Sequence, residues 1–466
     1  MLPRSEVHAS LNSQTFVPSP SKIETRTQEI GQQIFSGSSM SIFAKNYWYT
    51  KMMELATSDA RVKTQLFHFV DVLPVLQTVE QKRDHLIEYL SAPYGQKSWP
   101  MVLKLISSLV RVPLLDRAMV GIADFQVKQM AKNFIVGNSL EEALPKLLNA
   151  RSKKIAFTLD ILGEGVFSDY EAQFYFDKYK TLIEGLGEAS KSWKKISPID
   201  ESSLGDIPPV NISIKISALD CRMDSMSFEA SLKRLIARLE PIMELAMKKN
   251  VFINFDMEQF ALKDLTRELF KQLLLMPKFK NYRFFGIVCQ AYLKSSLSDI
   301  YEWIEIAKQR GTPFSIRLVK GAYWDYETIV ANQNGWESPV FAKKVESDAN
   351  YEACAKVLLD AFPAIELALG SHNIRSISYA LAYAEEIQLP ENSLEVQMLY
   401  GMADPFKESL VKRGVRIREY APVGEMLPGL SYLVRRLLEN SANDSFLKQS
   451  FLDNTGIHHL LRSPKS

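Results

Sequence analysis

The sequence has few cysteines and lacks long apolar runs, and each shortage excludes a class of protein. Its 466 residues include only three cysteines, Cys221, Cys289 and Cys354. They are odd in number and far apart, so neither a disulfide framework nor a cysteine-based metal site is expected. No apolar run reaches the roughly 18 residues of a membrane span, and the N-terminus lacks the apolar region of a secretory signal. We therefore expect a cytoplasmic protein, peripheral to the inner membrane if it contacts a membrane at all.

The sequence also has no large excess of positive or negative charge. The 56 lysines and arginines nearly balance the 54 aspartates and glutamates, for a formal net charge of +2. Nucleic acid is therefore not an expected partner. The sequence has no H-x-H or H-E-x-x-H string, so no metal is expected. No glycine-rich nucleotide-binding loop follows an expected strand, because the nearest string, Gly185–Gly187, lies within a helical pattern.

The pattern along the chain predicts four regions. Residues 1–40 are rich in Ser, Thr, Gln and Pro and are expected to form a flexible segment. Residues 41–150 carry apolar residues at helical spacing and are expected to form a helical arm domain. Residues 151–445 alternate eight β-rich runs with helix-length segments, and residues 446–466 are expected to be a tail. The expected strands are 155–161, 212–217, 251–256, 284–290, 314–319, 365–369, 394–399 and 415–420.

Eight strands alternating with helices predict an α/β fold, a distorted (β/α)₈ barrel preceded by an α-helical arm. A doubly wound sheet is the alternative, but it would call for the glycine-rich loop that is missing.

One face of the expected strands is unusually polar. Side chains alternate along a strand, so if Phe157 and Leu159 pack against helices, Thr158 and Asp160 face the barrel interior. Barrel interiors are normally filled by branched apolar side chains. Either an internal salt-bridge network or a large polar ligand at the carboxyl ends of the strands would explain this polarity. The same face carries polar residues on the later strands, namely Ser213, Lys215, Asn254, Asp256, Gln290, Ser315, Arg317, Glu366, His372, Glu395, Gln397, Arg416 and Arg418.

The end of the fifth expected strand combines two cations, a glycine and two aromatic residues within Arg317–Trp324. This combination suits a flat anionic cofactor, since arginine would stabilise developing negative charge and Gly321 would allow close approach of the backbone. Taken alone, Lys320 could also be the Schiff-base lysine of an aldolase or a surface cation. His372 ends the sixth strand, where it would hydrogen-bond a cofactor or play a structural role.

A late helical segment places Arg435 and Arg436 beside each other and Glu439 three to four residues further on. Surface ion pairs are the ordinary explanation of this spacing. If the helix instead caps the barrel mouth, the two guanidinium groups could bind one carboxylate.

These strings together resemble the proline dehydrogenase family, and within it the proline dehydrogenase domain of bifunctional proline utilization A. The resemblance covers most of the chain from about residue 40, including the helical stretches at 50–56 and 66–74 that precede the barrel. The strings occur one per strand end, at 213–219, 290–292, 317–324, 371–373, 420–424 and 433–440.

The resemblance implies FAD-dependent oxidation of L-proline to Δ1-pyrroline-5-carboxylate, the first step of proline catabolism to glutamate. Electrons would then pass to a membrane quinone. The implied substrate-binding residues are Lys215, Leu318, Tyr323, Tyr420, Arg435 and Arg436, with the two arginines and Lys215 on the carboxylate. Glu164 matches the family's gate residue.

The resemblance also assigns catalytic roles to Asp256 and Arg317, with Arg317 near the flavin. The residues implied to bind FAD are Met257, Gln290, Arg317, Val319, Lys320, Gly321, Ala322, Trp324, Ser371, His372 and Glu439.

Three features depart from the family. Ala342 stands where many relatives carry a threonine near the flavin. No β-rich N-terminal segment resembles the family's DNA-binding module. The sequence ends soon after Asn440, so we expect no aldehyde dehydrogenase domain in it. We expect a pyrroline-5-carboxylate dehydrogenase either as a partner protein or as a domain that is missing from this sequence. A Schiff-base aldolase or an inactive scaffold barrel remains an alternative.

Overall fold

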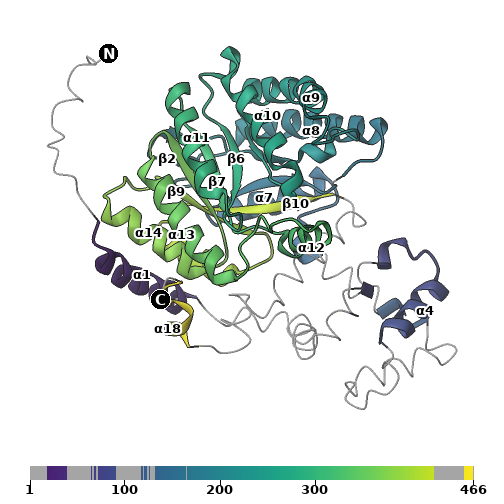
Figure 1. The fold of residues 1–466 in the computed structure, drawn as a ribbon, viewed down its shortest axis with the longest axis horizontal. Coiled ribbons are helices and arrows are strands. Elements are labelled where there is room, and N and C mark those ends of the chain that lie inside the picture. The colour runs from purple at the N-terminus through teal and green to yellow at the C-terminus, as the bar shows by residue number, and fades with distance from the viewer. Residues whose placement is uncertain are drawn as a thin grey trace.

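The chain forms a closed barrel of eight parallel strands surrounded by helices (Figure 1). The computed structural model describes residues 18–38, 72–90, 132–163, 165–424 and 456–464, with residues 65, 68–69, 117–118, 120–122 and 125. Around the barrel the strand order is β1-β10-β9-β8-β7-β6-β5-β4, and β4 closes against β1. The predicted barrel is thereby confirmed. Its strands are β1 (Ile155–Ile161), β4 (Asn211–Ile214), β5 (Phe252–Phe255), β6 (Phe285–Gln290), β7 (Phe314–Val319), β8 (Ile365–Gly370), β9 (Leu394–Leu399) and β10 (Ile417–Val423).

Helices cover the outside of the barrel because the outward side chains of the strands are apolar. The ring of Phe314 on β7, for example, lies edge-on to Phe270 and Trp303 of two neighbouring helices, with ring centroids 5.8 and 5.9 Å away. Burial of such aromatic side chains is a major contribution to stability. The helices that follow the strands are α8 (Asp169–Ala189), α9 (Phe228–Lys249), α10 (Lys263–Leu275), α11 (Ser296–Arg310), α12 (Trp324–Asn334), α13 (Lys344–Asp360), α14 (Ile374–Glu386) and α15 (Asp404–Lys412).

Two strands differ from the predicted bounds by more than one residue. The second barrel strand, β4, ends at Ile214, and the chain continues as the short 3₁₀ helix η4 (Ile216–Ala218). The last strand, β10, was expected to end at Tyr420 but extends through Pro422 to Val423. Proline is tolerated here because beyond Tyr420 the strand pairs with β1 and no longer with β9. The antiparallel pair β2 (Glu201–Ser202) and β3 (Gly205–Asp206) lies between α8 and β4 along the chain.

The N-terminal region contains a helix where a flexible segment was expected. Helix α1 (Pro20–Gly37) packs against α14 and α15, and it buries Ile23, Ile30 and Ile34. These residues recur at helical spacing on one face, so the helix is stabilised by burial against the barrel helices. In Figure 1 it runs beside α14, close to the C-terminal helix α18 (Ile457–Leu460).

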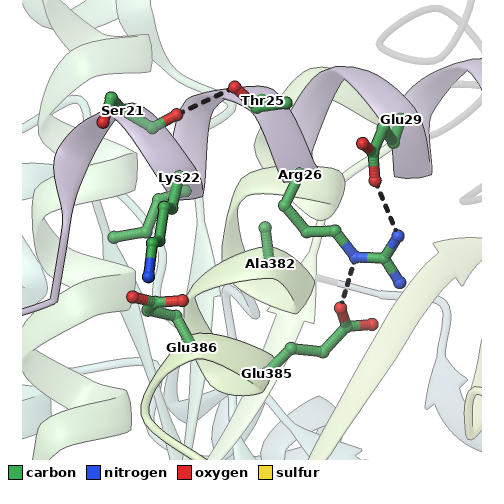
Figure 2. Close-up of a pocket in the computed structure, with 9 residues that line it drawn as sticks. Ser21, Lys22, Thr25, Arg26, Glu29, Ala382, Glu385 and Glu386 are labelled. Carbon is green, nitrogen blue, oxygen red and sulfur yellow. Dashed lines mark hydrogen bonds and ion pairs between the residues drawn. The ribbon is translucent and has the colours of Figure 1, made fainter.

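Ion pairs accompany this packing along a surface groove of about 480 Å³ between α1 and α14 (Figure 2). Arg26 donates from Nε to Glu385 at 2.6 Å and from Nη1 to Glu29 at 2.8 Å. Exposed pairs of this kind contribute little each, so the buried apolar face of α1 provides most of the attachment. The groove lies on the outer side of the barrel helices and holds none of the predicted site residues.

The expected arm at 41–150 lies mostly outside the described residues. Within it, the structure describes α4 (Val79–Leu90) and α7 (Leu140–Ser152), and α7 leads directly into β1. Among the described residues, no helix combines the length and apolarity needed to cross a membrane.

Candidate active site

Four charged side chains and a tyrosine converge at the carboxyl ends of five barrel strands. Lys215 pairs with Asp160 at the end of β1 and lies 3.8 Å from Asp256, which follows β5. Arg317 on β7 donates from Nη1 to Asp256 Oδ1 at 2.6 Å. Tyr420 on β10 joins the two ion pairs, since its hydroxyl donates to Asp256 Oδ2 at 2.7 Å and accepts from Lys215 Nζ at 3.2 Å. The four charged side chains are each less than 10% exposed, so these contacts compensate the cost of their burial.

The protonation of Tyr420 follows from this environment. Burial of its hydroxyl, with the nearby Asp160 and Asp256 carboxylates, raises the pKa of Tyr420 well above its ordinary value. The hydroxyl therefore stays protonated and donates to Asp256. The guanidinium carbon of Arg317 lies 5.4 Å from the centroid of the tyrosine ring, within the range of a cation–π contact.

Hydrogen bonds to residues outside the cluster also hold Arg317 and Lys215 in place. Arg317 Nη2 donates to Ser213 Oγ at 3.1 Å, and the backbone N–H of Lys215 donates to the hydroxyl of Tyr179 on α8 at 3.3 Å. A group held by several contacts loses less freedom when a ligand binds, so the cluster is preorganised.

Next to this cluster, a second group of predicted residues has features suited to a flat cofactor. The Nε2 of Gln290 donates to the carbonyl of Glu258 at 3.1 Å, while its Oε1 is buried and has no partner among the described residues. Gly321 has φ +120°, and a Cβ at this position would collide with the ring of Tyr292. A buried acceptor without a partner is a feature of a ligand-binding wall, whereas the glycine is required by the packing of the Tyr292 ring against the backbone.

Lys320 is half-buried and forms an ion pair with Asp348. Burial lowers the pKa of Lys320 to about 8, against the effect of the Asp348 carboxylate, which acts to raise it. This lysine is therefore not the freely exposed surface cation that the sequence alone allowed.

The remaining predicted cofactor residues lie at strand ends or just beyond them. The backbone N–H of Leu399 donates to His372 Nε2 at 3.0 Å, which leaves the proton of the neutral ring on Nδ1. Trp324, at the start of α12, donates from Nε1 to the carbonyl of Phe341 at 2.8 Å. Met257, Val319 and Ser371 are half-buried, and Ala322 is exposed.

The structure does not bring every predicted residue to the site. Leu318 is fully buried on the face of β7 opposite Arg317, together with Phe314 and Ile316, so its side chain packs under the helices and not beside the cluster. Tyr323 is half-buried at the N-cap of α12. Four further predictions lie outside the described residues, namely Glu164, Arg435, Arg436 and Glu439.

Asp160 is the member of the cluster that the sequence did not single out. It was assigned only to the inward face of its strand, although the structure makes it the ion-pair partner of Lys215. A carboxylate at the end of a barrel strand, on the same face as a predicted site lysine, was the available signal.

The amino-terminal end of the barrel interior holds a separate salt-bridge network. Arg418 binds Glu395 through two contacts of 2.7 and 2.9 Å and donates to the carbonyl of Phe157 at 2.7 Å. Burial acts to raise the pKa of Glu395, but Arg418 and Arg416 hold it at about 2. The polar interior thus contains a salt-bridge network at one end and the residues of the candidate site at the other.

Comparisons with known proteins identify two matching family models. The proline dehydrogenase model matches residues 143–449, and the model of the proline utilization A N-terminal domain matches residues 24–134. The bifunctional protein PutA of Klebsiella aerogenes is 33% identical over 339 residues, which are 71% of this chain and 25% of that protein. Proline dehydrogenase 1 of Bacillus subtilis is 25% identical over 322 residues, 69% of this chain and 90% of that protein.

A solved structure of proline utilization A from Bdellovibrio bacteriovorus, inactivated by N-propargylglycine, is also similar. It is 45% identical, with a TM-score of 0.86 over 95% of this chain and 44% of that chain. The matched region is about a quarter of the length of the PutA proteins of Klebsiella aerogenes and Escherichia coli. Because the proline dehydrogenase model matches more than half of its residues, the chain belongs to the proline dehydrogenase family.

Proposed function

We propose that this chain oxidises L-proline to Δ1-pyrroline-5-carboxylate with FAD as its cofactor and a membrane quinone as the electron acceptor. The proposal rests on one observation, a buried cluster of charged side chains at the carboxyl ends of the strands in a barrel of this family. The cluster consists of Asp160, Lys215, Asp256 and Arg317, which are joined by Tyr420. Active sites of such barrels lie at this end.

The residues around the cluster fit a flavin. Gln290 offers a buried acceptor that has no partner within the part of the chain that the structure describes, and Lys320 offers a cation. When bound, FAD would accept the electrons removed from the amine-bearing carbon of proline. The residues that we propose hold it are Met257, Gln290, Arg317, Val319, Lys320, Gly321, Ala322, Trp324, Ser371, His372 and Glu439.

On the substrate side, we propose that Lys215, Arg435 and Arg436 bind the carboxylate of proline. Tyr420 and Tyr323 pack around its ring, and Glu164 acts as the gate. Binding the carboxylate between cations orients the amine-bearing carbon, and such orientation supplies a large share of the rate enhancement of many enzymes. Asp256 keeps Arg317 in place, so that the guanidinium can stabilise negative charge near the cofactor.

A similar protein gives chemical support for this assignment. The Bdellovibrio bacteriovorus protein was inactivated by N-propargylglycine, which is a secondary amine bearing a carboxylate, as proline is. We expect the same compound to inactivate this chain. We also propose that the product passes to a pyrroline-5-carboxylate dehydrogenase, since the PutA relatives are bifunctional and longer than this chain.

The visible absorption spectrum of the purified protein, before and after anaerobic addition of L-proline, tests the proposal. We expect flavin bands that bleach when proline is added. A protein that binds no FAD, or a flavin spectrum that proline leaves unchanged, would contradict it.

The Schiff-base alternative rests on Lys320, because a lysine with a pKa of about 8 can act as a nucleophile near neutral pH. Borohydride trapping of a carbonyl substrate on this lysine would favour an aldolase-like enzyme. Trapping on Lys215 is not expected, since Lys215 lies between the carboxylates of Asp160 and Asp256.

A further inference from the structure

Glu258 is a buried carboxylate beside the site that none of the proposed roles uses. It lies two residues after Asp256 and is 3% exposed. Both of its carboxylate oxygens bind Ser217: Oε2 accepts the backbone N–H at 3.2 Å, and Oε1 accepts the hydroxyl. These two hydrogen bonds link the loop after β4 to the loop after β5.

The link extends to two further strand ends. Ser217 Oγ accepts the backbone N–H of Gly165 at 3.2 Å, and the Ser217 carbonyl accepts that of Val166 at 3.2 Å. On the other side, the Glu258 carbonyl accepts Gln290 Nε2 at 3.1 Å. The loops after β1, β4, β5 and the end of β6 are thereby joined through two side chains.

Ser217 and Glu258 each lie close in the sequence to a residue of the charged cluster. Ser217 is two residues from Lys215, and Glu258 is two residues from Asp256, so the link sets the separation of the two segments that carry these charges. Burying a carboxylate costs free energy that its hydrogen bonds must compensate, and a neutral side chain could join two loops at lower cost.

We propose that Glu258 and Ser217 are positioning residues, which hold Lys215 and Asp256 at their working separation and fix Gln290 beside them. This inference rests on the proposed function, because its effect is measured on proline oxidation. Proteins that bind substrate between separate strand ends need such contacts, since a displacement of about 1 Å can cost a hundredfold in rate.

The test compares Glu258→Gln, Ser217→Ala and the double variant with the unmodified protein, all loaded with FAD. We expect the rate constant for anaerobic flavin bleaching, divided by the proline concentration for half-saturation, to fall about 10- to 100-fold in each single variant. Both changes weaken the hydrogen bond between the Ser217 hydroxyl and the Glu258 side chain, and Ser217→Ala also removes the acceptor of the Gly165 N–H, so the double variant should be little worse than Ser217→Ala. Flavin content should stay near that of the unmodified protein.

Asp200→Asn is the matched control. Asp200 is a buried carboxylate that also accepts a backbone N–H, from Ile196 at 2.9 Å, but it pairs with Arg151 near the start of β1, away from the site. We expect Asp200→Asn to lower the melting temperature without changing the kinetics of flavin bleaching.

The outcomes separate this inference from the proposed function. If the unmodified protein is not bleached by proline, the proposed function fails, and this inference fails with it. If the unmodified protein is bleached and the variants behave like it, or their losses multiply in the double variant, only the positioning role is overturned. If neither single variant folds while Asp200→Asn does, Glu258 and Ser217 are needed for folding of the barrel. The positioning role is then again overturned.

Discussion

The pKa of Lys320 provides a quantitative test of the proposed FAD site. Burial lowers this pKa to about 8, so the amine is almost fully charged at about pH 6.5 and about one-tenth charged at about pH 9. If the ammonium form holds an anionic group of FAD, deprotonation removes the attraction and affinity falls as the pH rises. We expect a constant affinity below about pH 7 and a loss of about tenfold for each pH unit above about 8.

Neighbouring charges predict the direction in which variants shift this profile. Asp348 acts to raise the Lys320 pKa, so Asp348→Asn should move the fall in affinity to lower pH. Lys344, which lies 2.8 Å from Asp348 Oδ2, acts to lower it, so Lys344→Met should move the fall to higher pH. Lys320→Met should bind FAD more weakly at neutral pH and should lose this pH dependence.

Fluorescence titration of the apoprotein with FAD, between about pH 6.5 and 9.5 at constant ionic strength, measures these affinities. The reasoning would be refuted by an affinity that does not change with pH in the unmodified protein. It would equally be refuted if Lys320→Met kept the same fall, because another group would then be responsible for it.

Three further predictions concern the substrate side and the close packing around it. Arg435→Met or Arg436→Met should raise the proline KM at least about tenfold while FAD stays bound, because a charge-assisted contact to the carboxylate is lost; an unchanged KM in both variants would remove the carboxylate-binding assignment. Tyr420→Phe should lower the free energy of unfolding by about 2 kcal/mol, measured by urea denaturation, since the hydroxyl that joins two ion pairs is lost. Gly321→Ala should lower the melting temperature by several degrees, because φ is +120° and the new methyl would collide with Tyr292; a melting temperature like that of the unmodified protein would show that the loop can adapt.

The barrel could be predicted from the sequence because its strands are short, regular and separated by helix-length segments. The least accurate boundaries were the ends of β4 and β10. Strand β10 continues past Tyr420 because it goes on pairing with β1, while Val136 and Gly137 bind its other edge in place of β9. Helix α1 was missed because the surrounding Ser, Thr and Pro dominated the composition. The spacing of Ile23, Thr27, Ile30 and Ile34, all buried on one face, was the signal that could have revealed it.

The site could be predicted only in part, because its contacts join residues far apart in the sequence. Asp160 pairs with Lys215 across 55 positions, and no local pattern reports such a pairing. The assignment of Leu318 came from resemblance alone. The period-two alternation of β7 already opposed it, because a neighbour of the inward-facing Arg317 must face outward.

The charge balance of the cluster indicates where the affinity for a carboxylate must come from. Asp160 and Asp256 each carry one negative charge, and Lys215 and Arg317 each carry one positive charge, so the four buried groups sum to zero. A neutral cluster orients an anion through its nearest donors but does not attract it strongly. A single uncompensated cation at about 4 Å would contribute on the order of 4 kcal/mol at the effective dielectric constant of a protein site. The proposed carboxylate site therefore requires positive charge beyond these four residues, which is the role proposed for Arg435 and Arg436.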